Sequence, residues 1–184
     1  MKWHWRNSPQ RYGCLSAGLH WFMLLLLIAV YASMELRDLY PKGSAPREAM
    51  KTWHYMLGLT VFALALLRLA VQFIGPLPTI SPRPTKWMDW AAKLMKVALY
   101  LFMIGMPLLG WLLLSAKGAS IPFFGLQLVP LINENKALAE SIKELHEALS
   151  VAGYFLIGAH SVAALYHHYL LRDDTLRRML PMTD

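Results

Sequence analysis

Histidines recur in this chain where the neighbouring sequence is almost entirely apolar. His146 and His160 lie fourteen residues apart near the C-terminus, with Gly153 midway between them, and His167 continues the seven-residue interval. Seven residues advance a helix by about 700°, close to two full turns, so these positions form one stripe, with His146 and His160 about 21 Å apart along the axis. Such a stripe of metal-ligating side chains could hold two prosthetic groups at two depths.

Four long apolar segments must position these histidines. The chain has 184 residues, 57% of them apolar and 16% charged, and its mean hydropathy is +0.37. A helix that spans a membrane needs about 20 predominantly apolar residues. Four windows approach that length, at residues 15–34, 52–74, 90–115 and 145–171. We therefore expect an integral membrane protein of the all-α class, with one four-helix transmembrane bundle formed by a single domain over residues 1–184.

Basic residues flanking the windows predict the orientation. Of the 18 lysines and arginines, eleven fall on the side of the two termini and the middle loop, and seven fall in the first and third loops. Because cytoplasmic flanks carry more basic residues, we expect both termini in the cytoplasm. The N-terminal window is longer than a usual signal-peptide core and carries His20, so we expect a mature helix there. The pI of about 9.6 indicates contact with anionic lipid head groups, and no basic face with interleaved aromatic residues suggests nucleic-acid binding.

Depth in the membrane sorts four histidines into two pairs. His20 and His160 are predicted at matching depths in the cytoplasmic half, whereas His54 and His146 each open a helix at the outer surface. A histidine inside a bilayer is costly unless something binds it, and haem iron accepts axial imidazoles, so each pair could hold one six-coordinate haem b. Cys14 is the only cysteine, which excludes a CxxCH attachment site, so any haem would be held non-covalently. Electron transfer is then the expected chemistry, since an iron with both axial positions filled does not readily bind oxygen.

Each of these residues also has a purely structural interpretation. A single histidine at a membrane helix end is often interfacial or bonded to the backbone, and His167 and His168 could be interfacial residues. Gly153, and Gly58 one turn after His54, could clear space for a porphyrin or could only permit close packing of helices. These alternatives remain open on the sequence alone.

Several motifs resemble those of the bacterial cytochrome b561 family, and the resemblance covers nearly the whole chain. They are His54 with Gly58, HW at 20–21, LR at 67–68, SPRP at 81–84, PLLGW at 107–111 and, most specific, LHEAL…GYFLIGAHSVAALYHHYLLRDDTLRRMLP at 145–181. The resemblance implies a four-helix protein of the bacterial inner membrane with two b haems. The members most similar to this pattern are superoxide oxidases, which pass electrons from superoxide to ubiquinone. It implies that His20 and His160 ligate the cytoplasmic-side haem and that His54 and His146 ligate the periplasmic-side haem.

The resemblance also assigns residues outside the histidine pairs. In those relatives, a basic residue in the PxP loop and the histidine seven residues after the last ligand contact quinone, and these positions are Arg83 and His167 here. Arg68 lies fourteen residues after His54 on the same helix face and could neutralise a haem propionate or face the quinone site. Where many members have histidine early in the third helix, this chain has Lys93 and Lys96, which we expect to snorkel toward the inner interface.

The resulting functional hypothesis is a superoxide:quinone oxidoreductase with two haem b groups and ubiquinone as the acceptor. Because superoxide is an anion, basic loop residues could raise its encounter rate; these are Lys42, Arg47, Lys51, Lys117 and Lys136. One alternative is a haem b membrane anchor that relays electrons between quinone and a partner dehydrogenase or hydrogenase. A second alternative is a haem-free transporter or metal-binding membrane protein.

Overall fold

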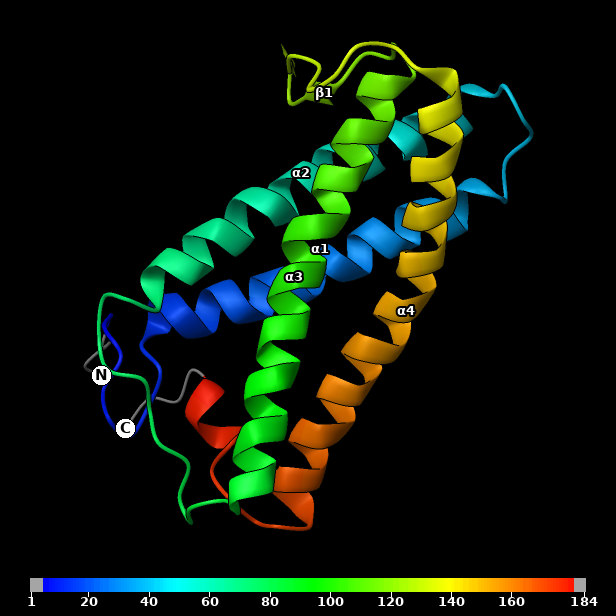
Figure 1. Ribbon diagram of the computed structural model, residues 1–184. Helices are drawn as coiled ribbons and strands as arrows, with labels where there is room; N and C mark the ends of the chain where they lie inside the picture. Colours follow the sequence, from blue (N-terminus) through cyan, green and yellow to red (C-terminus); the bar gives the residue numbers. More distant parts are fainter. Residues whose placement is uncertain (1–4, 181–184) are drawn as a thin grey trace. The chain divides into compact units, whose positions relative to one another are not determined.

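The computed structural model of the chain describes residues 5–180. Its described elements, in chain order (Figure 1), are α1 (Cys14–Arg37), α2 (Ala45–Val71), α3 (Lys86–Ala116), β1 (Pro122–Phe123), β2 (Leu126–Gln127), α4 (Lys136–Tyr169) and the 3-10 helix η1 (Arg177–Met179). The helices α1 to α4 are all long and apolar enough to cross a membrane, judged by length and composition. The predicted all-α class with four membrane-length helices is confirmed.

All four helices begin before their apolar windows, and α2 and α4 do so by the most, seven and nine residues, because polar residues start them. The helix α4 begins at Lys136, and Asn135 caps it: its side-chain Oδ1 accepts a hydrogen bond of 3.0 Å from the backbone N–H of Leu138. The helix α2 begins at Ala45 and carries the acidic Glu48 in its first turn, where a negative charge is favourable. Hydropathy locates the apolar part of a helix, whereas capping decides where the helix starts.

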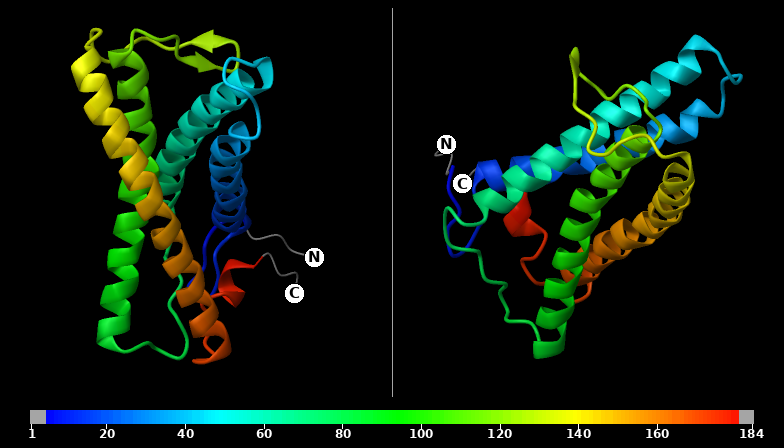
Figure 2. Two further views of the ribbon diagram at one scale, coloured as in Figure 1. Left: turned by 90° about the vertical axis from the view of Figure 1, so that its right-hand side faces the viewer. Right: turned by 45° about the horizontal axis from the view of Figure 1, so that its top comes forward.

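A short hairpin between α3 and α4 was not expected from the sequence. The strands β1 and β2 pair antiparallel, with Phe123 opposite Leu126 (Figure 2). The two residues between them, Phe124 and Gly125, have positive φ angles of 46° and 87°, as a tight two-residue hairpin turn requires. Phe123 packs against a buried cluster of Leu59, Leu114 and Ile121, which ties this loop to the helices α2 and α3.

The helices expose large apolar side chains over much of their surface. Leu94 and Leu101 on α3 are 71% and 70% exposed, and Phe155 and Val162 on α4 are 74% and 66% exposed. A soluble monomer rarely leaves so many large apolar side chains in contact with water. Their exposure is expected for helices whose outer faces contact lipid.

Two compact units divide the chain. Unit 1 consists of Met1–Phe22, Leu66–Leu101 and Gly153–Asp184, and unit 2 of Met23–Ala65 and Phe102–Ala152. Every long helix contributes residues to both units, and the single domain over residues 1–184 stays a prediction. His20 and His160 belong to unit 1, while His54 and His146 belong to unit 2. Each predicted histidine pair therefore lies within one unit.

The C-terminal segment of unit 1 lies beside the N-terminal half of α1 (Figure 2). The indole N–H of Trp21 donates a hydrogen bond of 2.9 Å to the carbonyl oxygen of Met179 in η1. Gly13, directly before α1, has no room for a side chain, because a Cβ there would lie 2.4 Å from the carbonyl oxygen of Trp5. Its N–H also donates to Asn7 Oδ1 at 2.9 Å, which fixes the entry into the helix.

Candidate functional site

The histidine pair of unit 2 joins α2 to α4. The ring centres of His54 and His146 are 6.2 Å apart, with the ring planes inclined at 77°. The Nδ1 atom of His54 lies 3.2 Å from the carbonyl oxygen of Val30 on α1 and 3.4 Å from Ser33 Oγ. A carbonyl can only accept, so Nδ1 carries the hydrogen and donates it, which orients the ring and leaves Nε2 available to a ligand.

Two glycines lie near this pair, and one of the pair's own ring nitrogens has no hydrogen-bond partner. A Cβ built at Gly110 on α3 would lie 3.6 Å from Cε1 of His146, so this glycine brings α3 close to the imidazole. Within residues 5–180, the buried Nδ1 of His146 has no hydrogen-bond partner. A Cβ built at Gly58 would meet nothing within 4 Å. Close packing of helices therefore does not explain Gly58, and space is open one turn from His54.

The pair of unit 1 joins α1 to α4 with nearly the same geometry. The ring centres of His20 and His160 are 6.1 Å apart, and their planes are inclined at 70°. The ring of His20 also meets the edge of Trp21, with centres 5.2 Å apart. The buried Nδ1 of His20 has no hydrogen-bond partner in the described part of the chain. The ring of His20 is therefore not explained as a buried histidine that simply bonds to the backbone.

Both pairs have the dimensions that one shared metal ion requires. Two metal–imidazole bonds of about 2 Å each, plus about 1 Å from nitrogen to ring centre on each side, separate the ring centres by about 6 Å. Among the described residues, no three of His, Cys, Asp or Glu come together at a metal-binding distance. Two nitrogens suit an iron whose other four positions a porphyrin fills, whereas zinc sites use three or four protein ligands. The residues present thus fit a bis-histidine haem at each pair.

Arg68 on α2 is a partly buried cation in unit 1. In the described part of the chain its guanidinium has no hydrogen bond or ion pair, and it is within electrostatic range of His20, His160 and Tyr100. Gln72, directly after the end of α2, donates a hydrogen bond to the hydroxyl of Tyr100. A cation in such surroundings is stabilised by an anionic group, such as a carboxylate of a bound ligand.

His167 lies at the end of α4 and has a carboxylate partner. Its Nδ1 is 2.6 Å from Oδ2 of Asp173, and the two side chains are 17% and 4% exposed. Burial acts to raise the pKa of Asp173, but hydrogen bonds from His167 and from the Thr175 backbone N–H outweigh it and hold the pKa below its usual value. Asp173 is therefore ionised at neutral pH, and its carboxylate orients the ring of His167. The neighbouring His168 differs, since its buried Nδ1 has no hydrogen-bond partner within residues 5–180.

Arg83 lies exposed in the loop between α2 and α3. No hydrogen bond joins it to His167 in the described structure, but the two segments are connected. Ser81, two residues before Arg83, exchanges hydrogen bonds with Asp174, the residue after Asp173. The structure thus brings together the two segments that carry the predicted quinone residues.

The lysines at the start of α3 are exposed, and one of them is paired. The ammonium of Lys93 lies 2.8 Å from Asp89 one turn earlier and 5.6 Å from the centre of the Trp90 ring. Lys96 is also exposed. These contacts agree with side chains at an interface and give no indication of a ligand role.

Sequence reasoning missed the groups that hold the histidines. Val30 and Ser33 contact His54 from another helix, and no spacing in the sequence links them. Asp173 lies six residues after His167, which is not a helical neighbour spacing. Asp173 contacts the His167 ring only because the chain reverses its direction after α4 at Arg172, which has a φ of 54°. A polar residue soon after a helix end is too common a signal to identify such a partner.

Four membrane-length helices that carry two imidazole pairs define a multi-pass membrane protein with sites suited to haem. Over residues 11–182, the sequence matches the family model described as prokaryotic cytochrome b561. The chain belongs to this family of membrane electron-transfer proteins, which bind haem b and whose fold is a membrane helical bundle.

Curated relatives match over almost their entire length. Cytochrome b561 homolog 1 of Escherichia coli (strain K12) is 42% identical over 163 residues, which cover 89% of this chain and 93% of that protein. The probable superoxide oxidase CybB of Yersinia pestis is 37% identical over 172 residues, or 94% of this chain and 97% of that protein. Cytochrome b561 homolog 2 of Escherichia coli (strain K12) is 32% identical over 180 residues, with coverage of 95% and 93%.

Proposed function

We propose that this protein is a di-haem b oxidoreductase of the bacterial inner membrane that oxidises superoxide at the periplasmic side and reduces ubiquinone. His54 and His146 hold the periplasmic-side haem, and His20 and His160 hold the cytoplasmic-side haem. The observation that carries the proposal is the pair of ring separations, 6.2 Å and 6.1 Å, each of which fits one bis-histidine iron. When bound, haem supplies reversible one-electron oxidation and reduction.

The choice of substrates rests on the relative that bears the name probable superoxide oxidase. Two superoxide ions give up one electron each and become oxygen, and one ubiquinone takes up two electrons and two protons and becomes ubiquinol. On the cytoplasmic side, His167 hydrogen-bonds the quinone and Arg83 contributes positive charge. Arg68 neutralises a haem propionate or an oxygen of the quinone. Both termini lie in the cytoplasm, as the distribution of basic residues predicts.

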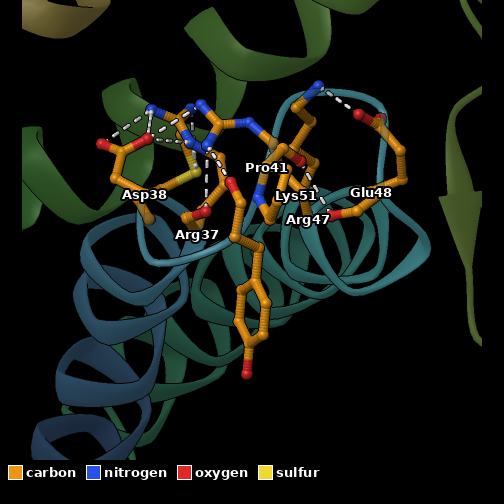
Figure 3. A network of polar contacts seen from close by, with 9 residues as sticks. Arg37, Asp38, Pro41, Arg47, Glu48 and Lys51 are labelled. Atoms are coloured by element: carbon orange, nitrogen blue, oxygen red, sulfur yellow. Dashed lines mark hydrogen bonds and ion pairs between the residues drawn. The ribbon is translucent and has the colours of Figure 1, made fainter.

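Attraction of superoxide by basic loop residues depends on which cations are unpaired (Figure 3). Arg47 lies 2.9 Å from Asp38 and donates to the carbonyl oxygens of Arg37 and Tyr40, so it holds the loop between α1 and α2 together. Lys51 lies 2.7 Å from Glu48. The Glu48 carboxylate largely neutralises Lys51. Asp38 also lies 3.2 Å from Arg37, so Arg37, Asp38 and Arg47 together keep one net positive charge. Steering would then rest on this charge together with Lys42, Lys117 and Lys136, and a superoxide rate that does not fall with ionic strength would exclude it.

Haem content and superoxide-driven quinone reduction of the purified protein test the function together. We expect about two b haems per chain by pyridine haemochrome. We also expect ubiquinone reduction that starts when a superoxide source is added and stops when superoxide dismutase is added. Haem-free protein would exclude the whole proposal. Quinone reduction that does not depend on superoxide but requires a co-purified dehydrogenase or hydrogenase would favour the membrane-anchor alternative.

Gly58→Leu is expected to remove one of the two haems while the protein itself still folds. Outside the adjoining backbone of its own helix, the described structure has no atom within 4 Å of a Cβ at this position, so there is open space for a larger side chain unless a group is bound beside His54. Haem content should fall to about one per chain, and Gly58→Ala should fall less. Gly158→Leu on α4, where a Cβ also meets nothing within 4 Å, is the matched control and should keep both haems. Full haem content in Gly58→Leu would show that the macrocycle does not lie there.

A further inference from the structure

The residue pair Asp173–Asp174 begins four residues after the end of α4 and contacts two different segments of unit 1. Asp173 turns back on α4: its backbone N–H donates to the carbonyl oxygen of His167 at 3.2 Å, while its Oδ2 accepts from Nδ1 of the same residue at 2.6 Å. Its other oxygen, Oδ1, accepts from the backbone N–H of Thr175 at 2.9 Å. Both oxygens of this carboxylate are thus engaged, and its orientation is fixed.

Asp174 makes a reciprocal pair of hydrogen bonds with the loop between α2 and α3. Its backbone N–H donates to the carbonyl oxygen of Ser81 at 3.2 Å, and its Oδ1 accepts from the N–H of Ser81 at 2.9 Å. A second connection lies nearby, where Arg178 Nη1 donates to the carbonyl oxygen of Pro78 at 2.9 Å. The segment that carries Arg83 is therefore anchored on one side by Asp174 and Arg178.

We infer that Asp173 and Asp174 are positioning residues of the quinone site: Asp173 fixes the tautomer and orientation of His167, and Asp174 holds the loop that presents Arg83. This inference rests on the proposed function, since it requires quinone to bind beside His167 and Arg83. Both residues lie within the 145–181 motif, but neither that motif nor the histidine stripe assigns them a role.

The chemistry follows from which ring nitrogen carries a hydrogen. An ionised carboxylate can only accept, so Nδ1 of His167 keeps its hydrogen and Nε2 faces the substrate. When Nε2 takes a proton from water, the Asp173 carboxylate stabilises the resulting imidazolium. The proton then passes from Nε2 to an oxygen of the quinone as electrons arrive, and the ring returns to its neutral form with Nδ1–H intact. Two such transfers supply the two protons that quinone needs, with the two electrons from two superoxide ions. Within residues 5–180, the titratable groups found beside His167 are Asp173 and Tyr166, whose ring centre is 6.2 Å from that of His167.

Substitutions at the two aspartates should have different kinetic effects. In Asp173→Asn, an amide NH₂ can donate to Nδ1 and favour the wrong tautomer, so kcat for ubiquinone reduction should fall by about 10- to 100-fold. The rate should also decline with rising pH from a lower pH than in the wild type, and Asp173→Glu should recover part of kcat. In Asp174→Ala the loop loses one of its two hydrogen bonds to residue 174, the one that the carboxylate accepts from Ser81. The KM for ubiquinone should therefore rise several-fold while kcat changes less. Asp89→Asn, at an exposed carboxylate paired with Lys93, is the matched control and should change neither constant.

Each variant is compared by steady-state reduction of a short-chain ubiquinone, with haem content measured on the same samples. Full haem content in Asp173→Asn together with wild-type kcat and pH profile would overturn the positioning role and leave the di-haem proposal standing. If His167→Gln also kept wild-type kinetics at full haem content, the quinone site itself would be misplaced. If instead Asp173→Asn lost haem in proportion to activity, its role would be structural, and the inference would be wrong.

Discussion

His160→Ala should lower the haem content from about two to about one per chain and abolish superoxide-driven reduction of ubiquinone. The ring centre of His160 lies 6.1 Å from that of His20, and removal of one imidazole leaves the iron between them with a single protein ligand. His54→Ala should also leave about one haem, because it leaves His146 as the single partner in unit 2. Pyridine haemochrome counts on purified wild type and both variants measure the effect.

His168→Ala is the matched control for these substitutions. His168 lies on the same helix as His160 and has a buried Nδ1 without a hydrogen-bond partner in the described residues, but no second histidine ring lies opposite it among the ring contacts found there. We expect this variant to keep about two haems. Retention of both haems in His160→Ala, or loss of both in His54→Ala with an intact fold, would contradict the assignment of two independent pairs.

Arg68→Gln is expected to lower the midpoint potential of the haem at His20 and His160 and to leave the other haem unchanged. A cation favours the form of the site that has gained an electron, and at an effective dielectric constant of about 20 a unit charge some 8 Å away contributes about 2 kcal/mol. For one electron this corresponds to a shift of about 50–100 mV. A redox titration followed in the haem absorption band should therefore show one midpoint potential lowered by this amount and the other at its wild-type value.

Arg68→Lys keeps the charge and should keep most of the potential, whereas Lys96→Gln removes an exposed charge and should have little effect. Equal shifts of both potentials in Arg68→Gln would show that the guanidinium does not act on one haem. An unchanged potential with a raised KM for ubiquinone would instead assign Arg68 to the quinone.

Hydropathy and histidine spacing predicted the parts of this protein that depend on one segment at a time. Each membrane helix satisfies its own backbone hydrogen bonds, so its existence follows from a run of apolar residues. Depth along a helix rises by a fixed amount per residue, which is why counting from the flanks matched His20 with His160 and His54 with His146. The hairpin at Pro122–Gln127 escaped this reasoning because its two-residue strands carry no periodic signal.

The sequence by itself determined the membrane class, the family and which histidines lie together in pairs, since these follow from composition, motifs and helix geometry. The tertiary structure decided which groups orient those histidines. Val30 on α1 contacts His54 on α2, and Asp173 reaches His167 only after the chain reverses at Arg172. Such contacts depend on the angle at which a chain leaves a helix and on what it then packs against, and local spacing does not encode either. The structure also showed Arg47 and Lys51 paired with carboxylates, which a count of charges along the sequence could not reveal.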